Sequence, residues 1–287
     1  MNGSLQLGPL AMPIGPLLLA LAAGLGLWAG KLTSRRSGLD PEPALLRMLL
    51  LGLLVARLAF VWTWRHAYWQ EPLTILDIRD GGWNPAVGLA ASCLYALALA
   101  KRQPALRRSL AAGLATTFVI GTAGAIWLWS SASNPARLPA LDLPALGGGN
   151  TALRSFTGKP IVINLWATWC PPCRREMPLL HQAQTEHPGV NFVFINQGED
   201  EQAVTLFLQA QHLPLRNVLL DKATQVGAAF DSMGLPTTLF IDAQGKLVST
   251  HLGALSKATL ARGIDGARFA PAAPSPSSPP SVSATTP

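Results

Sequence analysis

Cysteine and charge are both scarce in this chain. It contains three cysteines among 287 residues, which is too few for a disulfide scaffold, and no Cys/His cluster has the spacing of a zinc finger. Charged residues make up 13% of the sequence and hydrophobic residues 49%. That composition is typical of membrane segments joined to a soluble part, and the length allows two ordinary domains.

The formal net charge of +7 does not indicate a nucleic-acid-binding protein. Residues 137–268 hold eleven Lys and Arg against ten Asp and Glu, whereas residues 1–136 hold eleven against five. The basic excess therefore lies in the apolar half of the chain, where membrane topology accounts for it. We accordingly expect no nucleic-acid partner.

Four apolar stretches in the first half are each close to the ~20 residues that an α-helix needs to cross the hydrocarbon core. They cover residues 10–30, 44–64, 83–100 and 109–130. Basic side chains gather in the first and third connections and at the start of the second stretch: Lys31, Arg35, Arg36, Arg47, Lys101, Arg102, Arg107 and Arg108. The positive-inside rule places these connections in the cytoplasm. Both termini, and everything after residue 130, are then predicted to lie in the periplasm of a bacterial inner membrane.

A cleaved signal peptide is the competing interpretation of the first stretch, because ALAAG near Ala20 mimics a cleavage site. No positive charge precedes this stretch, however, and the basic cluster follows it, which is opposite to the order in a signal peptide. Cleavage would leave three spans and place the C-terminal domain in the cytoplasm.

Arg57 lies inside the second apolar stretch, where an ionisable side chain is costly and is usually functional or paired. One interpretation is therefore a functional site. The other is an internal ion pair, with Asp77 or Asp80 folded back from the following loop.

The segments ARLAFVW (56–62) and PLTILDIRDGGWNPAVGL (72–89) resemble the prolipoprotein diacylglyceryl transferase family. In this resemblance Arg57 matches an arginine of a transferase helix, whereas Ala86 stands where the family has a histidine. Transfer to a thiol needs a base or a polarising donor. The resemblance therefore implies a degenerate transferase-like membrane domain that serves as an anchor, a docking surface or a lipid-binding site.

Composition also sets the expected domain boundaries. Residues 1–130 form the membrane domain, and the Pro-, Gly- and Ser-rich sequence that follows suggests a linker over 131–137. A soluble domain is expected over 138–268. Residues 269–287 lack charge and any core-forming pattern, so they are expected to be disordered.

Apolar strands alternate with amphipathic helices in the soluble half, which predicts an α/β sheet with helices on both faces. The strands are expected at 161–167, 190–196 and 216–221, and as a hairpin of 236–242 with 246–252. The helices are expected from Pro171 onward, at 199–211, at 222–233 and after the hairpin. Acids open the second of these helices, where they complement its dipole.

Two of the three cysteines stand three positions apart in WATWCPPCRREMP (166–178), where a buried strand leads into a helix. The unpaired N–H groups and the dipole at the helix N-terminus favour the thiolate of Cys170 and lower its pKa. Cys173 lies within reach on the same turn, so one thiolate can attack a disulfide and the other can resolve the mixed disulfide. Pro171 and Pro172 remove N–H donors and stiffen this turn. A half zinc site or two buried structural thiols are the alternatives, but no further ligands with zinc spacing follow.

The stretch WATWCPPC resembles the active site of thioredoxin-like proteins, and Gly234-Leu235-Pro236-Thr237 resembles their cis-proline loop. LRSFTGKPIVINLWATWCPPCRREMP and an extra helix–strand unit around 200–220 are similar to the TlpA/ResA group of membrane-tethered thiol-disulfide oxidoreductases. This resemblance covers about 138–265 and implies a thioredoxin-like fold with a central mixed sheet.

The same resemblance implies roles for individual residues. Glu176 matches a glutamate of ResA-like active sites and would assist proton transfer; the alternative is an ordinary acid in the first turn of a helix. Asn164 stands where thioredoxin has a buried aspartate, so no carboxylate is available there. Pro236 is expected to be cis, opposite the cysteines. The expected substrate-binding residues are Trp169, Pro171, Pro172, Leu235 and Pro236.

Two further observations limit the chemistry. Peroxiredoxins fit less well, because their peroxidatic cysteine follows a threonine by three positions and here Thr168 precedes Cys170 by two. Cys93 is a single cysteine in the third apolar stretch, whereas a membrane electron relay of the DsbD or CcdA kind needs a pair. Electrons are therefore expected from a separate membrane donor of that kind.

The sequence thus predicts a membrane-anchored, periplasm-facing thiol-disulfide oxidoreductase that acts as a reductase on protein disulfides. It needs no cofactor beyond the Cys170–Cys173 disulfide and no metal. Two alternatives stay open: a lipid-binding or transferase-related membrane protein with an accessory redox domain, and a non-enzymatic adaptor that binds a partner through its membrane half.

Overall fold

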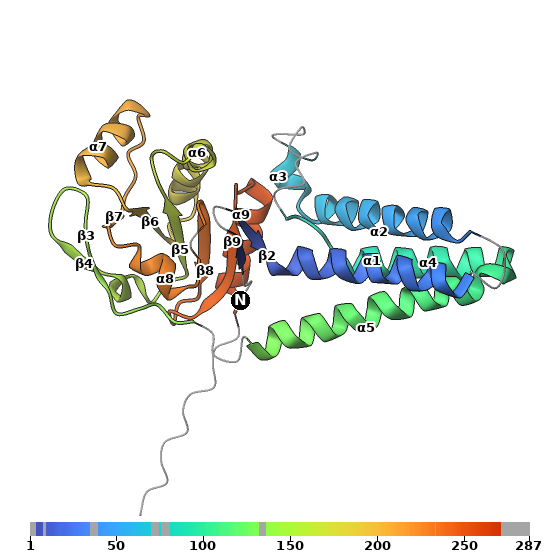
Figure 1. Ribbon diagram of the computed structural model, residues 1–287. Coiled ribbons are helices and arrows are strands. Elements are labelled where there is room, and N and C mark those ends of the chain that lie inside the picture. Colours follow the sequence, from blue (N-terminus) through green and yellow to red (C-terminus); the bar gives the residue numbers. More distant parts are fainter. Residues whose placement is uncertain are drawn as a thin grey trace, which may run out of the picture.

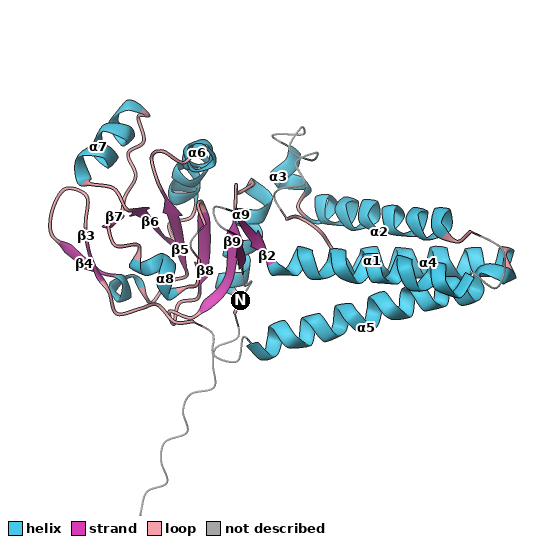
Figure 2. Cartoon of the chain, viewed as in Figure 1, coloured by secondary structure: helices cyan, strands magenta, loops and turns pink. Residues whose placement is uncertain are grey.

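The computed structural model of the chain describes residues 4–7, 10–34, 40–69, 75, 81–131, 136–232 and 234–270. Its first half consists mainly of long helices, and its second half is a β-sheet flanked by helices (Figure 1). The strands of that sheet stand out against the helices in Figure 2. The expected combination of a helical part and an α/β part is confirmed.

Four long helices lie close to the four apolar stretches. They are α1 (Ile14–Ser34), α2 (Glu42–Thr63), α4 (Pro85–Arg102) and α5 (Arg107–Ser131), with the short α3 (Arg65–Trp69) and η3 (Pro104–Leu106) between them. Among the described helices, three segments are long and apolar enough to cross a membrane: Leu17–Ser34, Glu42–Thr63 and Pro104–Trp127. The 18-residue α4 ends in Lys101 and Arg102 and lies outside this set. Length and composition therefore support three of the four predicted spans.

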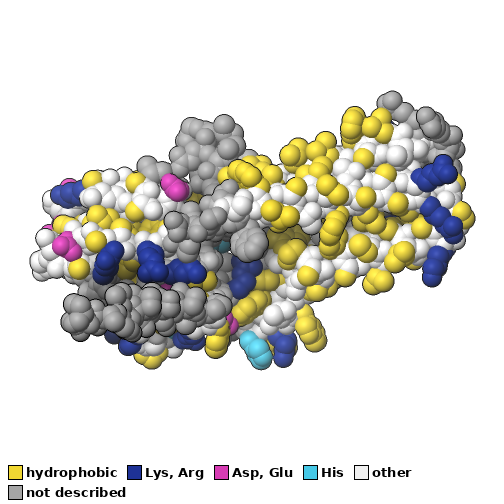
Figure 3. Space-filling view, turned by 90° about the horizontal axis from the view of Figure 1, so that it is seen from below, with side chains coloured by type: hydrophobic (Ala, Val, Ile, Leu, Met, Phe, Trp, Pro, Cys, Tyr) yellow, Lys and Arg dark blue, Asp and Glu magenta, His cyan; other side chains and the backbone are white. Residues whose placement is uncertain are grey.

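The surface of the helical half suits a bilayer. Figure 3 shows apolar side chains spread over these helices, and Leu50, Leu94 and Ile126 are each more than half exposed. Figure 3 also shows Lys and Arg side chains at the end of the helical half that lies away from the sheet. An apolar surface with basic side chains at one end is the pattern that the positive-inside rule describes.

Small residues let the helices approach closely, as is common in membrane helix bundles. The helix α1 packs along α5, and α2 packs along α4. A Cβ added to Gly88 of α4 would lie 2.7 Å from the Gly52 carbonyl oxygen of α2, and one added to Gly26 of α1 would lie 2.9 Å from the Gly113 carbonyl oxygen of α5. These two pairs therefore need glycine.

The start of the chain differs from the prediction. The first apolar stretch was expected to be helical from residue 10, but β1 (Ser4–Leu7) and β2 (Leu10–Pro13) form an antiparallel pair, and α1 begins only at Ile14. The strand β2 ends at Pro13. Proline lacks the N–H that would hydrogen-bond to a neighbouring strand, but it fits the boundary before a helix. The basic residues Arg35 and Arg36 lie outside the described residues.

A five-stranded mixed sheet forms the centre of the second half. Its strands are β5 (Ile161–Trp166), β6 (Asn191–Gln197), β7 (Val218–Asp221), β8 (Thr237–Ile241) and β9 (Leu247–Leu252). Their order is β7-β6-β5-β8-β9, with β5, β6 and β7 parallel and β8 and β9 antiparallel. The expected mixed sheet and its terminal hairpin are confirmed.

Two apolar cores cover the two faces of this sheet. One face packs against α6 (Pro171–Glu186), α7 (Glu201–Ala210) and α9 (Lys257–Arg268), with Trp166 fully buried between them. The other face packs against α8 (Gln225–Ala229), η4 (Leu153–Phe156) and the hairpin of β3 (Asp142–Pro144) with β4 (Asn150–Ala152). Helices on both faces were expected, and the placement of α6 on one face positions the cysteines.

Two predicted helices in this half have other bounds. The helix expected over 222–233 shrinks to α8, because the Asp221 carboxylate accepts the N–H groups of Gln225 and Val226 and so sets the helix start there. The helix expected over 199–211 begins at Glu201. At the end of the expected linker over 131–137, the Ala136 carbonyl accepts the Leu247 N–H and Arg137 forms a bridge with Lys246. Residues 132–135 and the tail residues 271–287 lie outside the described residues.

A small apolar contact joins the two halves. Phe60 of α2 and Tyr68 of α3 pack with Ala258 of α9, and the Arg262 guanidinium lies 5.2 Å from the centroid of the Phe60 ring. Cation–π contact of this kind adds to the apolar packing. The soluble half thus contacts the end of the helical half through α9 (Figure 1).

Candidate redox site

The chain direction at the end of β5 brings the two cysteines together. Cys170 is the N-cap of α6 and has extended backbone angles, and Pro171 occupies the first helical position, where its missing N–H costs nothing. Cys170 and Cys173 form a disulfide with a Cα–Cα distance of 5.3 Å. The Cys173 N–H also points at the Cys170 sulfur, 3.3 Å away. The predicted placement of the pair at a helix N-terminus is confirmed.

The disulfide is buried behind an exposed aromatic side chain. Cys170 is 3% exposed and Cys173 is fully buried, whereas the preceding Trp169 is 67% exposed. Pro171 is exposed and Pro172 is half-buried. Trp169 and Pro171 are therefore the solvent-exposed side chains next to the buried sulfurs, and their role in substrate binding stays a prediction.

The loop before β8 contains a cis peptide bond between Leu235 and Pro236, which confirms the predicted isomer. Its backbone is held by Thr237, whose hydroxyl donates to the Gly234 carbonyl over 2.7 Å. Leu235 is half-buried and packs against the core that contains the cysteines. Met233, the first residue of this loop, lies outside the described residues.

Glu176 lies beyond the first turn of α6 and is 3% exposed. Its carboxylate accepts a hydrogen bond from the Asn164 side-chain amide over 2.8 Å and another from the Leu255 N–H over 3.0 Å. Burial raises the pKa of Glu176 from 4.5 to about 7, and the two hydrogen bonds partly oppose that rise. Glu176 is therefore not an ordinary acid of an exposed first turn, and it can gain and lose a proton near neutral pH.

Asn164 connects Glu176 to the sheet. It lies on β5 and is 1% exposed, and its Nδ2 donates to the Thr238 hydroxyl on β8 over 3.1 Å as well as to Glu176. The buried carboxylate of this site therefore comes from the helix, since the strand position holds an amide.

Glu199 belongs to the site and was missed as such in the sequence, where it was interpreted as an acid of the first turn of a helix. The true N-cap is Asp200, which accepts the Ala203 N–H over 2.8 Å. Glu199 instead turns back and accepts the Thr168 N–H over 2.7 Å, the Thr168 hydroxyl, and the Asn196 amide over 2.6 Å. It thereby holds the loop that leads into Cys170, a contact that only the fold creates.

The aromatic side chains near the cysteines differ in their exposure to solvent. Trp166 is fully buried and packs 5.5 Å from the Phe207 ring, so it is a core residue. The Arg174 guanidinium lies over the same Phe207 ring at 5.7 Å. Trp169 is the exposed aromatic side chain of the motif.

Arg57 in α2 binds main-chain carbonyls. Its Nη1 donates to the Gly82 carbonyl over 2.8 Å, and its Nη2 and Nε donate to the Ile75 carbonyl over 2.9 and 3.2 Å. The guanidinium also lies 5.6 Å from the centroid of the Tyr68 ring. Asp77 and Asp80, the expected ion-pair partners, lie outside the described residues. The described contacts show Arg57 linking α2 to the main chain at Ile75 and Gly82.

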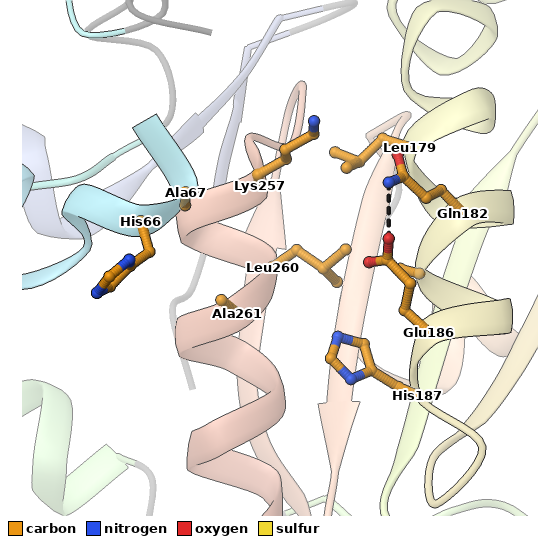
Figure 4. A pocket seen from close by; sticks show the side chains of 10 residues that line it. His66, Ala67, Leu179, Gln182, Glu186, His187, Lys257, Leu260 and Ala261 are labelled. Atoms are coloured by element: carbon orange, nitrogen blue, oxygen red, sulfur yellow. Dashed lines mark hydrogen bonds between the residues drawn. The ribbon is translucent and has the colours of Figure 1, made fainter. Parts of the chain in front are cut away.

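The hollow drawn in Figure 4 lies elsewhere. It has a volume of about 190 Å³ and lies between α3, α6 and α9, where Glu186 accepts a hydrogen bond from Gln182 over 2.7 Å. Neither cysteine lines it. Within the described part of the chain, no three His, Cys, Asp or Glu side chains are grouped so that they could hold a metal ion. The chemistry of the described residues therefore centres on the disulfide.

Known proteins share this arrangement of the second half. The Redoxin family model matches residues 132–264. The thioredoxin-like protein YneN of Bacillus subtilis is 31% identical over 131 residues, which cover 44% of this chain and 76% of that protein. The thiol-disulfide oxidoreductase ResA of Bacillus subtilis is 33% identical, with 45% and 73% covered. The chain belongs to the ResA-type thiol-disulfide oxidoreductases.

Further relatives of this ResA-type chain carry related names. The thiol:disulfide interchange protein DsbE of Pseudomonas fluorescens is 33% identical over 42% of the chain and 66% of that protein. A crystal structure of a putative DsbE from Chlorobium tepidum aligns with a TM-score of 0.43 and 27% identity over 47% of the chain and 97% of that structure. The identities to YneN and ResA show that the chain is a thiol-disulfide oxidoreductase, and relatives of this kind imply protein thiols or disulfides as substrates. The helical half precedes the residues that the Redoxin model matches.

Proposed function

We propose that the protein is a membrane-anchored disulfide reductase whose redox domain faces the periplasm. The observation that carries the proposal is the position of Cys170 at the N-terminus of α6, bonded to Cys173, with the buried Glu176 three residues further along the same helix. A thiolate at that position is stabilised by the N–H groups and dipole of the helix. Protein disulfides in the periplasm are the proposed substrates.

The reaction proceeds by two exchange steps in the reduced enzyme. The Cys170 thiolate attacks one sulfur of the substrate disulfide, so that a mixed disulfide forms and the other substrate sulfur leaves as a thiolate. Cys173 then loses its proton to the Glu176 carboxylate, and its thiolate attacks the Cys170 sulfur. The Cys170–Cys173 bond forms, the bond to substrate breaks, and the second substrate sulfur leaves as a thiolate. The substrate has gained two electrons and the enzyme pair has lost them.

Reduction of the Cys170–Cys173 disulfide requires two electrons from a second dithiol. We propose a separate membrane protein of the DsbD or CcdA type as that donor, because Cys93 is the single cysteine of the helical half and cannot form a dithiol pair. Substrate docks on Trp169, Pro171 and Pro172 and pairs with the Leu235 backbone beside Pro236. Exposure of Trp169 and burial of the sulfurs support this division between binding and chemistry.

The proposed membrane topology is based on the positions of the basic residues. Figure 3 shows Lys and Arg side chains at the end of the helical half away from the sheet, and the last turns of α1 and α4 carry Lys31, Lys101 and Arg102, which supports a cytoplasmic location for that end. The redox domain, at the other end, is then periplasmic. The described contacts of Arg57 are structural and Ala86 supplies no base, so we propose no lipid transfer.

The test is a thiol-labelling trap in intact cells with a membrane-impermeant maleimide that adds mass. Labelling of Cys170 and Cys173 without added reductant is the expected result, because it requires a periplasmic domain that is kept reduced. Labelling only after an external reductant would favour an oxidase, and labelling only after lysis would place the domain in the cytoplasm.

In parallel, Cys170→Ala is expected to abolish disulfide reduction by the purified full-length protein, and full activity of that variant would contradict the assigned chemistry.

A further inference from the structure

The buried amide of Asn164 is hydrogen-bonded on one side only. Its Nδ2 donates to the Glu176 carboxylate over 2.8 Å and to the Thr238 hydroxyl over 3.1 Å, which uses both N–H groups. Its Oδ1 is buried as well but meets no hydrogen-bond partner among the described residues. Buried amide oxygens are nearly always paired, so an unpartnered one next to a titrating carboxyl requires an explanation.

Both partners of Asn164 can reverse their hydrogen-bonding roles. A hydroxyl such as that of Thr238 donates or accepts equally well, and a carboxyl group accepts when ionised but donates from its O–H when protonated. The other carboxylate oxygen of Glu176 accepts the fixed Leu255 N–H over 3.0 Å. A proton on Glu176 is therefore best placed on the oxygen that faces Asn164, where the present amide orientation would set donor against donor.

Rotation of the side-chain amide by half a turn removes this conflict. Oδ1 then occupies the place of Nδ2 and accepts from the protonated Glu176 and from the Thr238 hydroxyl. Because no described partner holds Oδ1 in the present orientation, the rotation breaks no further hydrogen bond. On the side that faces Glu176 and Thr238, the amide thus matches both protonation states of Glu176, one in each orientation, and the rotation moves Nδ2 to the buried position that Oδ1 held.

We propose that the Asn164 amide reverses whenever Glu176 exchanges its proton, so that Asn164 is a positioning residue that keeps Glu176 oriented throughout the reaction. This rests on the proposed function, in which Glu176 accepts the Cys173 proton. The reversal holds the carboxyl group in place both before and after that transfer, whereas an aspartate at position 164 would repel the Glu176 carboxylate.

The experiment must distinguish proton exchange at Glu176 from proton exchange at other ionisable groups near this cluster. The two thiols of the reduced enzyme lie on the same helix, α6. His251 on β9 is the register partner of Thr238, and its Nε2 lies 3.0 Å from the Ala254 carbonyl oxygen. A His251→Gln variant removes the imidazole while the amide keeps a hydrogen-bonding group there.

The experiment is nuclear magnetic resonance of the oxidised full-length His251→Gln protein in detergent, labelled with ¹⁵N in asparagine side chains and ¹³C in glutamate carboxyls. The Asn164 signals are identified by their absence from an Asn164→Leu sample. We expect contacts between the Asn164 amide protons and Thr238 above pH 8, and their loss below pH 6, with the same midpoint as the Glu176 carboxyl carbon. A Glu176→Gln variant, which cannot titrate, is expected to abolish the change.

Contacts that persist unchanged while the Glu176 carbon titrates would overturn the reversal and leave the proposed function intact. A Glu176 carbon that does not titrate between pH 5 and 9 would overturn the reversal together with the proton-transfer role of Glu176. Loss of reductase activity in Cys170→Ala tests the redox function independently of both results.

Discussion

Glu199 accepts hydrogen bonds from both the main-chain N–H and the side-chain hydroxyl of Thr168, two residues before Cys170. The two residues are 31 positions apart in sequence and meet because β5 and β6 are parallel neighbours whose following loops emerge at the same edge of the sheet. The loop into the cysteines is thereby held from the side, independently of α6.

We expect Glu199→Ala to loosen this loop. Hydrogen bonds to charged groups contribute about 1.5–3 kcal/mol each when buried and less when, as here, the carboxylate is half-buried. A loss of roughly 2 kcal/mol in the free energy of opening is therefore expected. Hydrogen-exchange mass spectrometry of the peptide that contains Thr168 measures it. Glu201→Ala is the matched control, because it removes the same charge from the exposed helix start nearby; equal effects of both variants would contradict the assignment.

Glu176 makes stability depend on pH. Its pKa is raised from 4.5 to about 7 by burial, so between these values the folded state holds a proton that the unfolded state releases. Stability from this group is therefore fully present below pH 4.5 and is lost as pH rises towards 7, by about 3 kcal/mol in total. We expect Glu176→Gln to gain stability relative to the unsubstituted protein across that window, with no further gain above it.

The measurement is hydrogen exchange of β5 amides in both oxidised proteins between pH 4.5 and 8.5. Every ionisable group other than Glu176 is present in both proteins, so the difference between them reports on Glu176. A difference that does not change with pH would show that Glu176 keeps an ordinary pKa.

The close approach of α2 and α4 requires glycine at position 88. A Cβ there would lie 2.7 Å from the Gly52 carbonyl oxygen and 2.7 Å from the Ala56 Cβ, so Gly88→Ala forces the two helices apart. Overpacking of this kind costs about 1–3 kcal/mol. We expect a lower midpoint of thermal unfolding in detergent. Gly121→Ala on α5 is the control, because a Cβ there meets nothing within 4 Å; a matching loss in the control would contradict the packing argument.

Arg57 links α2 to the main chain at Ile75 and Gly82. Arg57→Leu keeps much of the apolar stem but removes the donors to the Ile75 and Gly82 carbonyls. Since these bonds involve a charged donor and are buried in part, we expect a loss of about 2–4 kcal/mol and faster proteolysis near Ile75. Arg47→Leu, an exposed arginine on the same helix, is the control. Unchanged proteolysis combined with lost phospholipid binding would favour a lipid site at Arg57 instead.

The sequence was most informative where local pattern and chemistry coincide. The apolar run 161–167 followed by Cys-Pro-Pro-Cys predicts a buried strand, a turn and a helix N-terminus, and each is present, with the strand ending at Trp166. The helix expected over 222–233 failed because the Asp221 side chain, rather than helix propensity, sets the start of α8. The strands before α1 were missed because a short apolar segment beside a long apolar run does not distinguish a strand from a helix.

By itself the sequence determined the redox pair, its place at a helix start and the division into apolar helices and an α/β domain, because these follow from residue spacing over one or two helical turns. Only the tertiary structure decided what surrounds the pair. Glu176 meets Leu255 from 79 positions away and Thr168 meets Glu199 from 31 away. Contacts of this kind depend on strand order and on the burial that accompanies it, and burial is also what raises the Glu176 pKa to about 7. The catalytic environment is therefore a property of the packed sheet and not of the motif alone.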